Sequence, residues 1–343
     1  MNTSTRIVIL YNSPIETGPL ATAYAESDAG VLNEVAAAEE SLARHGFSVR
    51  RAGVRRLADI PPALAAGPER LVFNLVERLD DSFTAFNFVP AVCDALGRSC
   101  TGGSSDALGL TLDKWIAKAR LKACGVGVAD AVMLSPGANM PDLPPFPLIV
   151  KPAAAGGSEG IDAALSIVRD TSALLRAATR IHEQFDQPAL AERFIEGREF
   201  NLSVIERNGR PEVLPVAEID FSLFPPDRPH IVDYAVKWIP GTIPGHVSPR
   251  KVPADIDAAS NAHLRSEALK AWLACGCRDY ARIDFRMDRE GRTYVLEVNV
   301  NPDISPLAGL PAALKAAAIS YDDFILAMVA NARARLVAIE PPG

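Results

Sequence analysis

The chain has 343 residues, of which 48% are hydrophobic and 22% charged, and its formal net charge is −7 at pH 7. This length predicts two or three domains with substantial cores, and the composition excludes a disordered chain. The acidic balance argues against nucleic acid or an anionic membrane as the main partner, and no apolar stretch approaches the length of a membrane span.

The amino terminus and the cysteines favour a cytoplasmic protein. The first apolar run, "RIVILY", begins too early and is too short for a secretory signal. The five cysteines match no zinc, thioredoxin or nucleophile spacing, so we expect reduced, partly buried thiols without a catalytic role: Cys93, Cys100, Cys124, Cys275 and Cys277.

The first third of the chain alternates between strands and helices. An apolar strand at 6–11 is followed by a helix over 27–46 with an apolar stripe, and strands are predicted at 47–54 and 70–76. Another helix is predicted at 89–98. The order strand, helix, strand predicts a parallel α/β layer, which we place at residues 1–104.

The middle of the chain has a different pattern of predicted helices and strands. Two short helical pieces over 105–127 precede a strand at 130–134, a proline-dense loop, a strand at 147–152 and a helix at 172–185. We interpret residues 105–190 as a small central domain, to which the resemblance described below gives the role of a lid.

The last part predicts an antiparallel sheet, which we assign to residues 191–343. Strands at 188–195, 198–207 and 211–219 are joined in part by an Asn-Gly turn, the typical hairpin signal. The segment 221–249 is rich in proline and is expected to be dominated by loops. A helix at 254–276, a hairpin of 280–288 with 292–300, and a closing helix at 321–337 complete the chain.

The hairpin carries polar side chains where a buried strand is expected. Arg282 and Asp284 are two residues apart, as are Glu297 and Asn299, so each pair shares a face. Either that face is solvated, which is common for such short motifs, or it holds a cation. Two carboxylates and an amide oxygen are ligands suited to Mg²⁺ and phosphate, and an arginine suits an anion.

Other charged residues are less distinctive on their own. Lys151 ends a strand and precedes a glycine-rich turn, where backbone N–H groups can approach phosphates. A flexible turn that binds no phosphate would have the same sequence pattern. Lys114 and Lys237 resemble ordinary surface lysines. Glu192 and Glu199 bracket a strand and a turn that could contact a nucleoside or solvent.

Taken in order, these segments resemble the ATP-grasp family, and within it the D-alanine–D-alanine ligase branch of carboxylate–amine ligases. The resemblance covers about residues 70–335 and rests on five motifs: "LDK" (112–114), "PLIVKPAAAGGSEGI" (147–161), "ERFIEGREF" (192–200), "ARIDF" (281–285) and "VLEVNVNPDIS" (295–305). It implies an α/β (α+β) fold of three lobes, with ATP between the last two.

The resemblance also implies a role for each matching residue. Lys114, Lys151 and Lys237 would hold ATP phosphates with the glycine-rich loop, including Gly157 and Ser158. The adenine would lie along the hinge formed by Glu192, Arg193, Phe194 and Ile195, with Glu199 on the ribose. Two Mg²⁺ ions, with Mn²⁺ as a substitute, would be held by Asp284, Glu297 and Asn299. Arg282 would stabilise the developing negative charge.

The departures from the family pattern all touch substrate binding. The family's loop serine aligns with Gly157, the tyrosine after its third lysine with Trp238, the Pro-Gly glycine with Asp303, and the serine that holds the acceptor carboxylate with Ala308. The glutamate of the first strand–helix loop has no clean match, Glu26 being near. We therefore predict poor D-alanyl-D-alanine synthesis, and more space at Ala308 and Gly309 for a different substrate.

The predicted function is ATP-dependent ligation of a small carboxylate to an amine, through an acyl phosphate, with release of ADP and phosphate. The alternatives are an ATP-grasp phosphotransferase, a D-alanine–D-alanine ligase proper, and a non-catalytic nucleotide-binding regulator, against which the complete Mg²⁺ and arginine set argues. Relatives commonly pair through the first domain, so a homodimer is expected.

Overall fold

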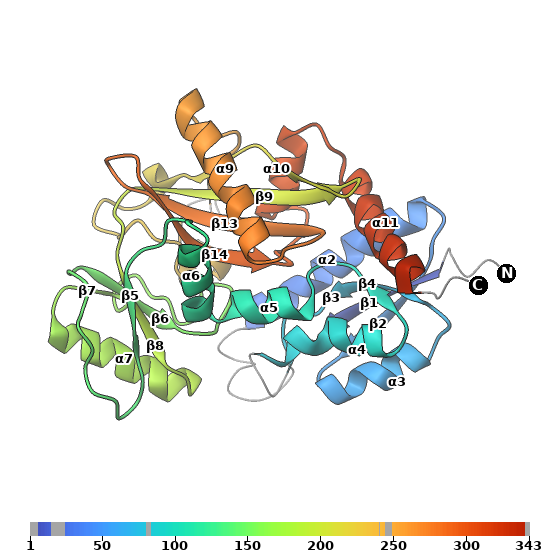
Figure 1. Cartoon of the computed structure of the whole chain (residues 1–343), viewed down its shortest axis with the longest axis horizontal. Coiled ribbons are helices and arrows are strands. Elements are labelled where there is room, and N and C mark those ends of the chain that lie inside the picture. The colour runs from blue at the N-terminus through green and yellow to red at the C-terminus, as the bar shows by residue number, and fades with distance from the viewer. Residues whose placement is uncertain (1–5, 15–24, 80–83, 240, 244–248, 340–343) are drawn as a thin grey trace.

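The computed structural model describes residues 6–14, 25–79, 84–239, 241–243 and 249–339, with the backbone alone for 25–29 and 337–339. It contains one parallel and two antiparallel sheets (Figure 1). The predicted mixed α/β class, with a parallel layer first and antiparallel sheets after it, is confirmed. None of the helices within these ranges has the length and apolar character that a membrane span requires.

The parallel sheet has the strand order β2-β1-β3-β4, so each later strand is added beside an earlier one through a helix. Successive residues of β1 face opposite sides: Ile7 and Ile9 pack towards α2, and Val8 and Leu10 towards α3 and α4. Both faces are therefore buried, which explains the unbroken apolar run of β1. The elements are β1 (Arg6–Asn12), α2 (Ala25–Arg44), β2 (Ser48–Val54), α3 (Ile60–Ala65), β3 (Leu71–Leu75), α4 (Val89–Ala95) and β4 (Ser99–Cys100).

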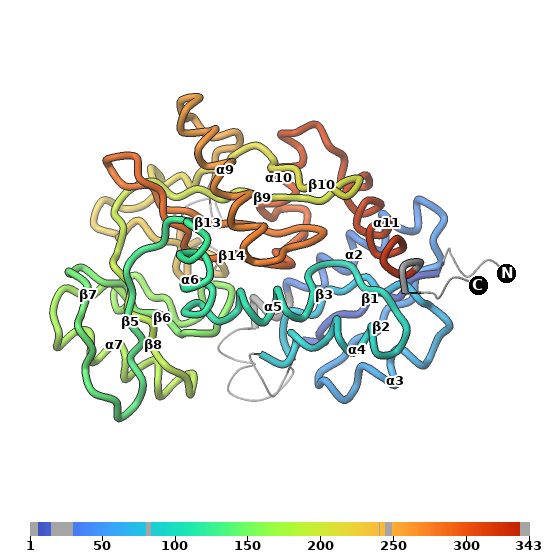
Figure 2. Tube along the Cα trace, in the orientation of Figure 1, coloured from blue at the N-terminus to red at the C-terminus, as the bar shows by residue number. Residues whose placement is uncertain are grey.

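Two helices connect this layer to the central sheet, and α5 crosses the middle of the molecule (Figure 2). Asp113 ends α5 and caps α6 by accepting hydrogen bonds from the N–H groups of Trp115 and Ile116. The central sheet has the order β5-β8-β6-β7, with α7 packed against it. The bounds are α5 (Ser105–Leu112), α6 (Lys114–Ala123), β5 (Ala131–Leu134), β6 (Leu148–Pro152), β7 (Ile167–Val168), α7 (Thr171–Phe185) and β8 (Ala189–Arg193).

The third sheet has the order β12-β11-β9-β13-β14, and β10 pairs with β9 through the predicted Asn208–Gly209 turn. Both turn residues have positive φ, 54° and 71°, as a two-residue hairpin turn requires. Helix α9 covers one face, and the other face forms part of a cavity. The elements are β9 (Arg198–Arg207), β10 (Arg210–Val213), β11 (Ala217–Ile219), α8 (Tyr234–Trp238), β12 (Arg250–Lys251), α9 (Ala258–Ala274), β13 (Tyr280–Met287) and β14 (Thr293–Val300).

A bulge in β14 explains how a strand with a buried face carries charged side chains. Asp284 pairs with Glu297 but Phe285 pairs with Val295, so Leu296 has no partner on β13. Before the bulge Val295 faces the core, and after it the alternation restarts with Val298. This extra residue turns Glu297 away from the core side that regular alternation from Val295 would give it.

The last two helices return to the first layer. Helices α10 (Gly309–Ala316) and α11 (Tyr321–Ile339) share a hydrophobic core with β1, β3 and α2. Figure 1 shows α11 beside α2, and an exposed ion pair joins them, with 2.7 Å between Arg44 Nη2 and Asp322 Oδ1. The two ends of the described chain therefore stabilise the same layer.

The expected elements are found, with three helices that the sequence patterns did not predict. Helix α8 lies inside the stretch expected to be loop-dominated, where Asp233 caps it by accepting from Val236 N–H at 3.0 Å. Helices α3 and α10 were also not predicted. The domain boundaries at residues 104 and 190 stay a prediction, because β8 spans residues 189–193 and pairs with both β5 and β6.

Candidate active site

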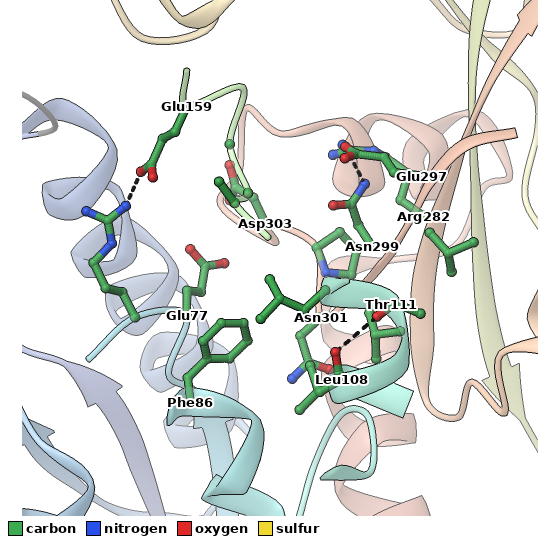
Figure 3. A pocket seen from close by; sticks show the side chains of 18 of the residues that line it. Glu77, Phe86, Leu108, Thr111, Glu159, Arg282, Glu297, Asn299, Asn301 and Asp303 are labelled. Carbon is green, nitrogen blue, oxygen red and sulfur yellow. Dashed lines mark hydrogen bonds and ion pairs between the residues drawn. The ribbon is translucent and has the colours of Figure 1, made fainter. Parts of the chain in front are cut away.

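A cavity of about 750 Å³ lies between the two antiparallel sheets and α2. Its walls come from α2, the start of α6, α8, the strands β6, β8, β9, β11, β12, β13 and β14, and the loops after β6 and β14. A smaller recess of about 190 Å³ opens beside it and shares several walls with it, including Lys237, Trp238, Arg282 and Asp303. Figure 3 shows this recess, with Glu77, Glu159 and Asp303 around the same space as Glu297 and Asn299.

The polar side chains of the hairpin converge on one face, as predicted. Asn299 Nδ2 lies 3.1 Å from Asp284 Oδ2 and 3.0 Å from Glu297 Oε1, and so donates to both carboxylates. Asn201 Nδ2 on the neighbouring β9 donates to Asp284 Oδ1 at 2.8 Å. The strands therefore hold two carboxylates within the reach of one amide group.

The arginine of this face forms a two-point ion pair with its neighbour. Arg282 Nε and Nη2 each lie 2.8 Å from an oxygen of Asp284. Burial opposes ionisation of Glu297, but Lys114, the Asn299 amide and Arg282 outweigh it and lower the pKa of Glu297 to about 2. Glu297 is therefore anionic at neutral pH, and Arg282 lies near it.

The donor set fits a divalent cation. Two carboxylates and an amide, whose Oδ1 can replace Nδ2 after a half rotation, provide the oxygen ligands that Mg²⁺ prefers. Among the described residues no group of three or more His, Cys, Asp and Glu side chains gathers as a metal site. A cation here would thus depend on Asn299 or on oxygens from a ligand.

A buried network of lysines borders the opposite wall. Glu192 on β8 is 1% exposed and lies 2.8 Å from Lys118 Nζ and 3.3 Å from Lys151 Nζ. Burial alone would raise the pKa of Glu192, but the two lysines outweigh it and lower the pKa. Lys114 donates to the carbonyl of Ala155 in the glycine-rich loop. Lys114 and Lys151 thus line one side of the cavity, and Lys118 lies behind them on Glu192.

Lys114 is a buried lysine with a lowered pKa. It is 7% exposed, and burial together with the nearby Lys151 lowers its pKa to about 8, although Glu297 opposes the shift. An anion in the cavity would stabilise the charged form of Lys114. The surface interpretation of Lys114 is therefore wrong, because its Nζ is turned into the protein.

The hinge segment after β8 is already partly hydrogen bonded. The N–H groups of Arg193 and Phe194 donate to the carbonyls of Asp130 and Pro147, both at 2.9 Å. An adenine at this edge would have to use other groups, such as those of Ile195, which lines the cavity.

Glu199 has an arginine partner that the sequence analysis did not identify. Arg286, 3% exposed, lies 3.0 Å from Glu199 Oε2 and also donates to the carbonyls of His230 and Gly197. Burial raises the pKa of Glu199, and Arg286 opposes the rise. Arg286 therefore fixes the side chain that was expected to bind a ribose.

The comparisons with known proteins agree with this geometry. Residues 138–330 match the family model described as D-ala D-ala ligase C-terminus. A D-alanine–D-alanine ligase of Bordetella pertussis is 30% identical over 83% of this chain and 84% of its own length, and an uncharacterised protein of Sinorhizobium fredii, y4sG, is 33% identical over 78% and 75%. The chain belongs to the D-alanine–D-alanine ligase family.

The fold comparison covers nearly the whole chain. A D-alanine–D-alanine ligase of Bacillus anthracis, solved in complex with ATP, aligns over 98% of this chain and 100% of its own with a TM-score of 0.76 and 18% identity. The chain thus has the ATP-grasp fold and is an ATP-dependent ligase that forms a C–N bond.

Where the chain departs from the family motifs, the structure gives each new residue a contact. Trp238 Nε1 donates to the carbonyl of Gly157 at 2.8 Å, and a Cβ on Gly30 of α2 would lie 3.5 Å from its ring. Ser158, with φ of 63°, donates to the carbonyl of Val232 at 2.8 Å. Trp238 and Ser158 therefore attach the glycine-rich loop to α8 and the segment before it.

The space beside Gly309 is shared with an arginine. A Cβ built on Gly309 would lie 3.2 Å from Arg250 Nη1, the end of a flexible side chain. Ala308 and Gly309 both line the cavity, and Ala308 is 8% exposed. The enlarged space for a different substrate stays a prediction.

A glutamate of the first helix, Glu34, lies close to Asp303, and the expectation for Glu26 stays a prediction. Glu26 is in α2, and its side chain lies outside the described part of the structure. Glu34 is 3% exposed and accepts a hydrogen bond at 2.9 Å from the N–H of Ile304, the residue that follows Asp303. Burial and the carboxylates of Glu77 and Asp303 raise the pKa of Glu34 well above its usual value. Glu77 behaves similarly, with a pKa of about 7 caused by burial and Asp303.

Four residues in or behind the walls of the cavity were missed in the sequence, and three of them left a signal there. Glu34 interrupts the apolar stripe of α2 formed by Val31, Val35 and Ala38, and Lys118 is one helical turn after Lys114. Arg286 could be read as continuing the face of Arg282 and Asp284. Arg250 left no signal, because only the folded chain brings β12 to α10.

Proposed function

We propose that this protein activates a small carboxylate with ATP and joins it to an amine, and that it makes D-alanyl-D-alanine inefficiently. The observation that supports this most strongly is the convergence of Asp284, Glu297 and Asn299 beside Arg282, opposite three buried lysines. A polyanion with a divalent cation complements that charge pattern.

The residues take the following roles in the proposal. Lys114, Lys151 and Lys237, with the loop around Gly157, hold the phosphates, and Glu199 accepts from the ribose while Arg286 holds it in place. The adenine lies along Glu192, Arg193, Phe194 and Ile195. Asp284, Glu297 and Asn299 would hold two Mg²⁺ ions, which neutralise phosphate charge and so favour transfer.

The reaction proceeds in two displacements. A carboxylate oxygen of the first substrate attacks the γ-phosphorus, the bond to ADP breaks, and an acyl phosphate forms. The amine then attacks the acyl carbon, phosphate leaves with the bonding electron pair, and the amine proton passes to phosphate or solvent. Arg282 is kept cationic by Asp284. It stabilises the negative charge that develops on the acyl oxygen after the amine bond has formed and before the phosphate bond breaks. The glycine-rich loop, held by Trp238, excludes water from the acyl phosphate.

The departures at Trp238, Asp303 and Ala308 support a substrate pair other than two D-alanines. Loss of a hydroxyl partner for a buried carboxylate costs about 1–3 kcal/mol, or roughly 5- to 150-fold in selection. The residues proposed to bind ATP match the family motifs, whereas the departures lie where the amino-acid substrates would bind. The proposed activation chemistry would therefore be kept while the choice of substrate differs.

A substrate panel tests the proposal. Purified protein, ATP and Mg²⁺ are incubated with single and paired D- and L-amino acids, and released phosphate and product mass are measured. Phosphate release with a product lighter by one water than the substrate pair is expected, with little from D-alanine alone. Robust D-alanyl-D-alanine formation contradicts the substrate proposal, and ADP without free phosphate would indicate a phosphotransferase. The homodimer and the cytoplasmic location stay predictions.

A further inference from the structure

Asp303 lies where the larger cavity and the recess join. Its side chain lines both spaces, as do those of Lys237 and Arg282. Figure 3 shows Asp303 with Glu77 and Asn299 around the recess. The family pattern has glycine at this position, so this chain has a carboxylate where that pattern has no side chain.

The loop that carries Asp303 is held on both sides. Pro302 before it is buried, and after it the N–H of Ile304 donates to Glu34 Oε2 at 2.9 Å. Asp303 Oδ1 accepts from the N–H of Ser305 at 2.7 Å, and within the described part of the chain Oδ2 accepts no hydrogen bond. Asp303 is half-buried, so one oxygen is fixed and the other can contact a substrate and exchange protons with water.

The other acid–base groups of the larger cavity are already paired. Cations or the Asn299 amide hold its remaining carboxylates, which are Glu159, Glu192, Glu199, Asp284 and Glu297. No histidine, cysteine or tyrosine of the described residues lines either space, and the lysines hold phosphate in the proposed function. Asp303 is therefore the carboxylate of this cavity that has no side-chain partner among the described residues.

Attack by an amine requires the removal of a proton. When the amine nitrogen bonds to the acyl carbon it gains positive charge, and the bond becomes stable once an N–H proton has left. A carboxylate within hydrogen-bond reach can accept that proton as the bond forms, which contributes about 10²- to 10⁴-fold in rate. Arg282, which stabilises the acyl oxygen in the proposed function, lines the same two spaces as Asp303.

The neighbours of Asp303 provide a route for the proton to leave. The groups that interact with it electrostatically come from α2, the loop after β3, α8, β12, β13 and α11, and are Glu34, Glu77, Lys237, Arg250, Arg282 and Tyr321. Burial and Asp303 raise the pKa of Glu77 to about 7. Glu77 can therefore take up and release a proton near neutral pH in the recess beside Asp303.

We propose that Asp303 is the general base that takes the proton from the attacking amine. The lone pair of the neutral amine forms the C–N bond, and one N–H proton passes to Asp303 Oδ2. The C–O bond to phosphate then breaks with its electron pair on the phosphate, and Asp303 gives the proton to phosphate or to water. This rests on the proposed ligase function and adds a catalytic residue to its second displacement.

The experiment compares wild type with Asp303→Asn, which keeps an oxygen for the N–H of Ser305 but can take no proton. Two acceptors are used with one carboxylate: the most active amine of the substrate panel, and hydroxylamine. Hydroxylamine traps the acyl phosphate as a hydroxamate, and its adduct is acidic enough to lose its proton to water. Asp94→Asn, exposed on α4, is the matched control. Thermal melting shows that each variant is folded.

The proposal expects a defect confined to turnover of the basic amine. Asp303→Asn should lower kcat with that amine by about 10²- to 10³-fold and leave its KM within about threefold. Hydroxamate formation and the KM for ATP should stay within about threefold of wild type. Asp303→Gly should show the same defect, and added formate should restore at least about tenfold, because it supplies a carboxylate in the vacated space.

Four results would overturn the proposal. An equal fall in product and hydroxamate formation would place Asp303 in activation of the carboxylate. A raised KM with unchanged kcat would make it a binding group, and unchanged kinetics would give it no role. A fall in Glu77→Gln without one in Asp303→Asn would assign the proton to Glu77.

The same measurements separate this proposal from the ligase function. In each of those four results, hydroxamate formation by wild type would leave the proposed function intact. A wild type that forms no hydroxamate and releases no phosphate would overturn the proposed function itself.

Discussion

The two sides of the cavity treat their carboxylates in opposite ways. On the nucleotide side, Glu192 and Glu297 have lysines or an arginine nearby, and their pKa values are lowered despite burial. On the substrate side, Glu34 and Glu77 face each other and Asp303, and their pKa values are raised. The same residue type is thus ionised in one wall and held towards its neutral form in the other.

The difference shows which wall has its charges paired within the protein. The proposed nucleotide side pairs its anions with cations from β6, α6 and β13, and these residues, except Lys118, lie in the segments that resemble the family motifs. The proposed substrate side gathers the carboxylates of Glu34, Glu77 and Asp303, of which only Asp303 departs from a family motif. Charge pairing within the protein therefore distinguishes the two walls more clearly than agreement with the family motifs does.

The largest expected effect is on the metal-binding face. Glu297→Gln keeps the shape but removes an anion that the structure holds ionised, so kcat should fall by about 10²- to 10³-fold. Phosphate release under saturating ATP and Mg²⁺ measures it. Glu290→Gln, on an exposed turn, is the control and should retain full activity. A Glu297→Gln variant as active as wild type would remove the metal role from this wall.

Breaking the buried lysine pair should have the next largest effect. Lys118→Met removes the nearer of two ammonium groups from Glu192 and leaves a buried carboxylate with one partner at 3.3 Å. The free energy of unfolding should fall by about 3 kcal/mol, as measured by urea denaturation. Lys122→Met on the exposed face of the same helix should change it by less than about 0.5 kcal/mol. Equal losses of stability in Lys118→Met and Lys122→Met would show that Glu192 does not depend on its pairing with Lys118.

The substrate side should show its strain in the pH dependence of stability. Raised pKa values mean that the folded protein binds protons more tightly than the unfolded chain, so this stability is complete below about pH 4.5 and is lost as the pH rises through about 7. Glu34→Gln keeps an acceptor for Ile304 N–H and removes one charge. It should be about 1–2 kcal/mol more stable than wild type at pH 8.

Melting temperatures of Glu34→Gln at pH 5 and pH 8 test this sign. Glu40→Gln, exposed on the same helix, is the control and should follow wild type at both values. A variant that is less stable than wild type at pH 8 would show that Glu34 has a cationic partner in the folded protein, and the contrast between the two walls would fail.

The smallest expected effect concerns the loop over the cavity. Trp238→Phe keeps an aromatic ring and loses the hydrogen bond to Gly157, at a cost of about 1 kcal/mol. Backbone hydrogen exchange of residues 153–166 should become several-fold faster. Trp115→Phe, 42% exposed on α6, should leave that exchange unchanged. Unchanged exchange in Trp238→Phe would show that the loop is held by its other contacts.

The sequence supports much of the fold because its local patterns agree with the final packing. Apolar strands buried on both faces, as in β1, and the Asn208–Gly209 turn act locally, and so they predict the parallel layer and a hairpin. The motif residues also come together as their spacing suggests, as for Asp284 and Asn299.

What the sequence could not predict depends on contacts between distant segments. Helix α8 has five residues, too few for a helical period, and forms because Asp233 caps it and Arg228 pairs with Asp233 at 2.8 Å. Arg250 is opposite Gly309 only after β11 and β12 have paired. Local periodicity carries no information about either contact.

Leu296 is the extra residue of the bulge in β14, and it affects the register of the strand rather than its chemistry. The residue has no partner on β13, and the bulge that accommodates it lets Val295 face the core while Glu297 and Asn299 face the cavity. Deleting Leu296 would make Val295 and Glu297 neighbours in a regular strand, and regular alternation would then keep Glu297 and Asn299 on the cavity face and Val298 in the core. Inserting one residue between Val298 and Asn299 would instead turn Asn299 towards the core of a regular strand, so we expect β14 to tolerate the loss of one residue at the bulge better than the gain of one beside the polar pair.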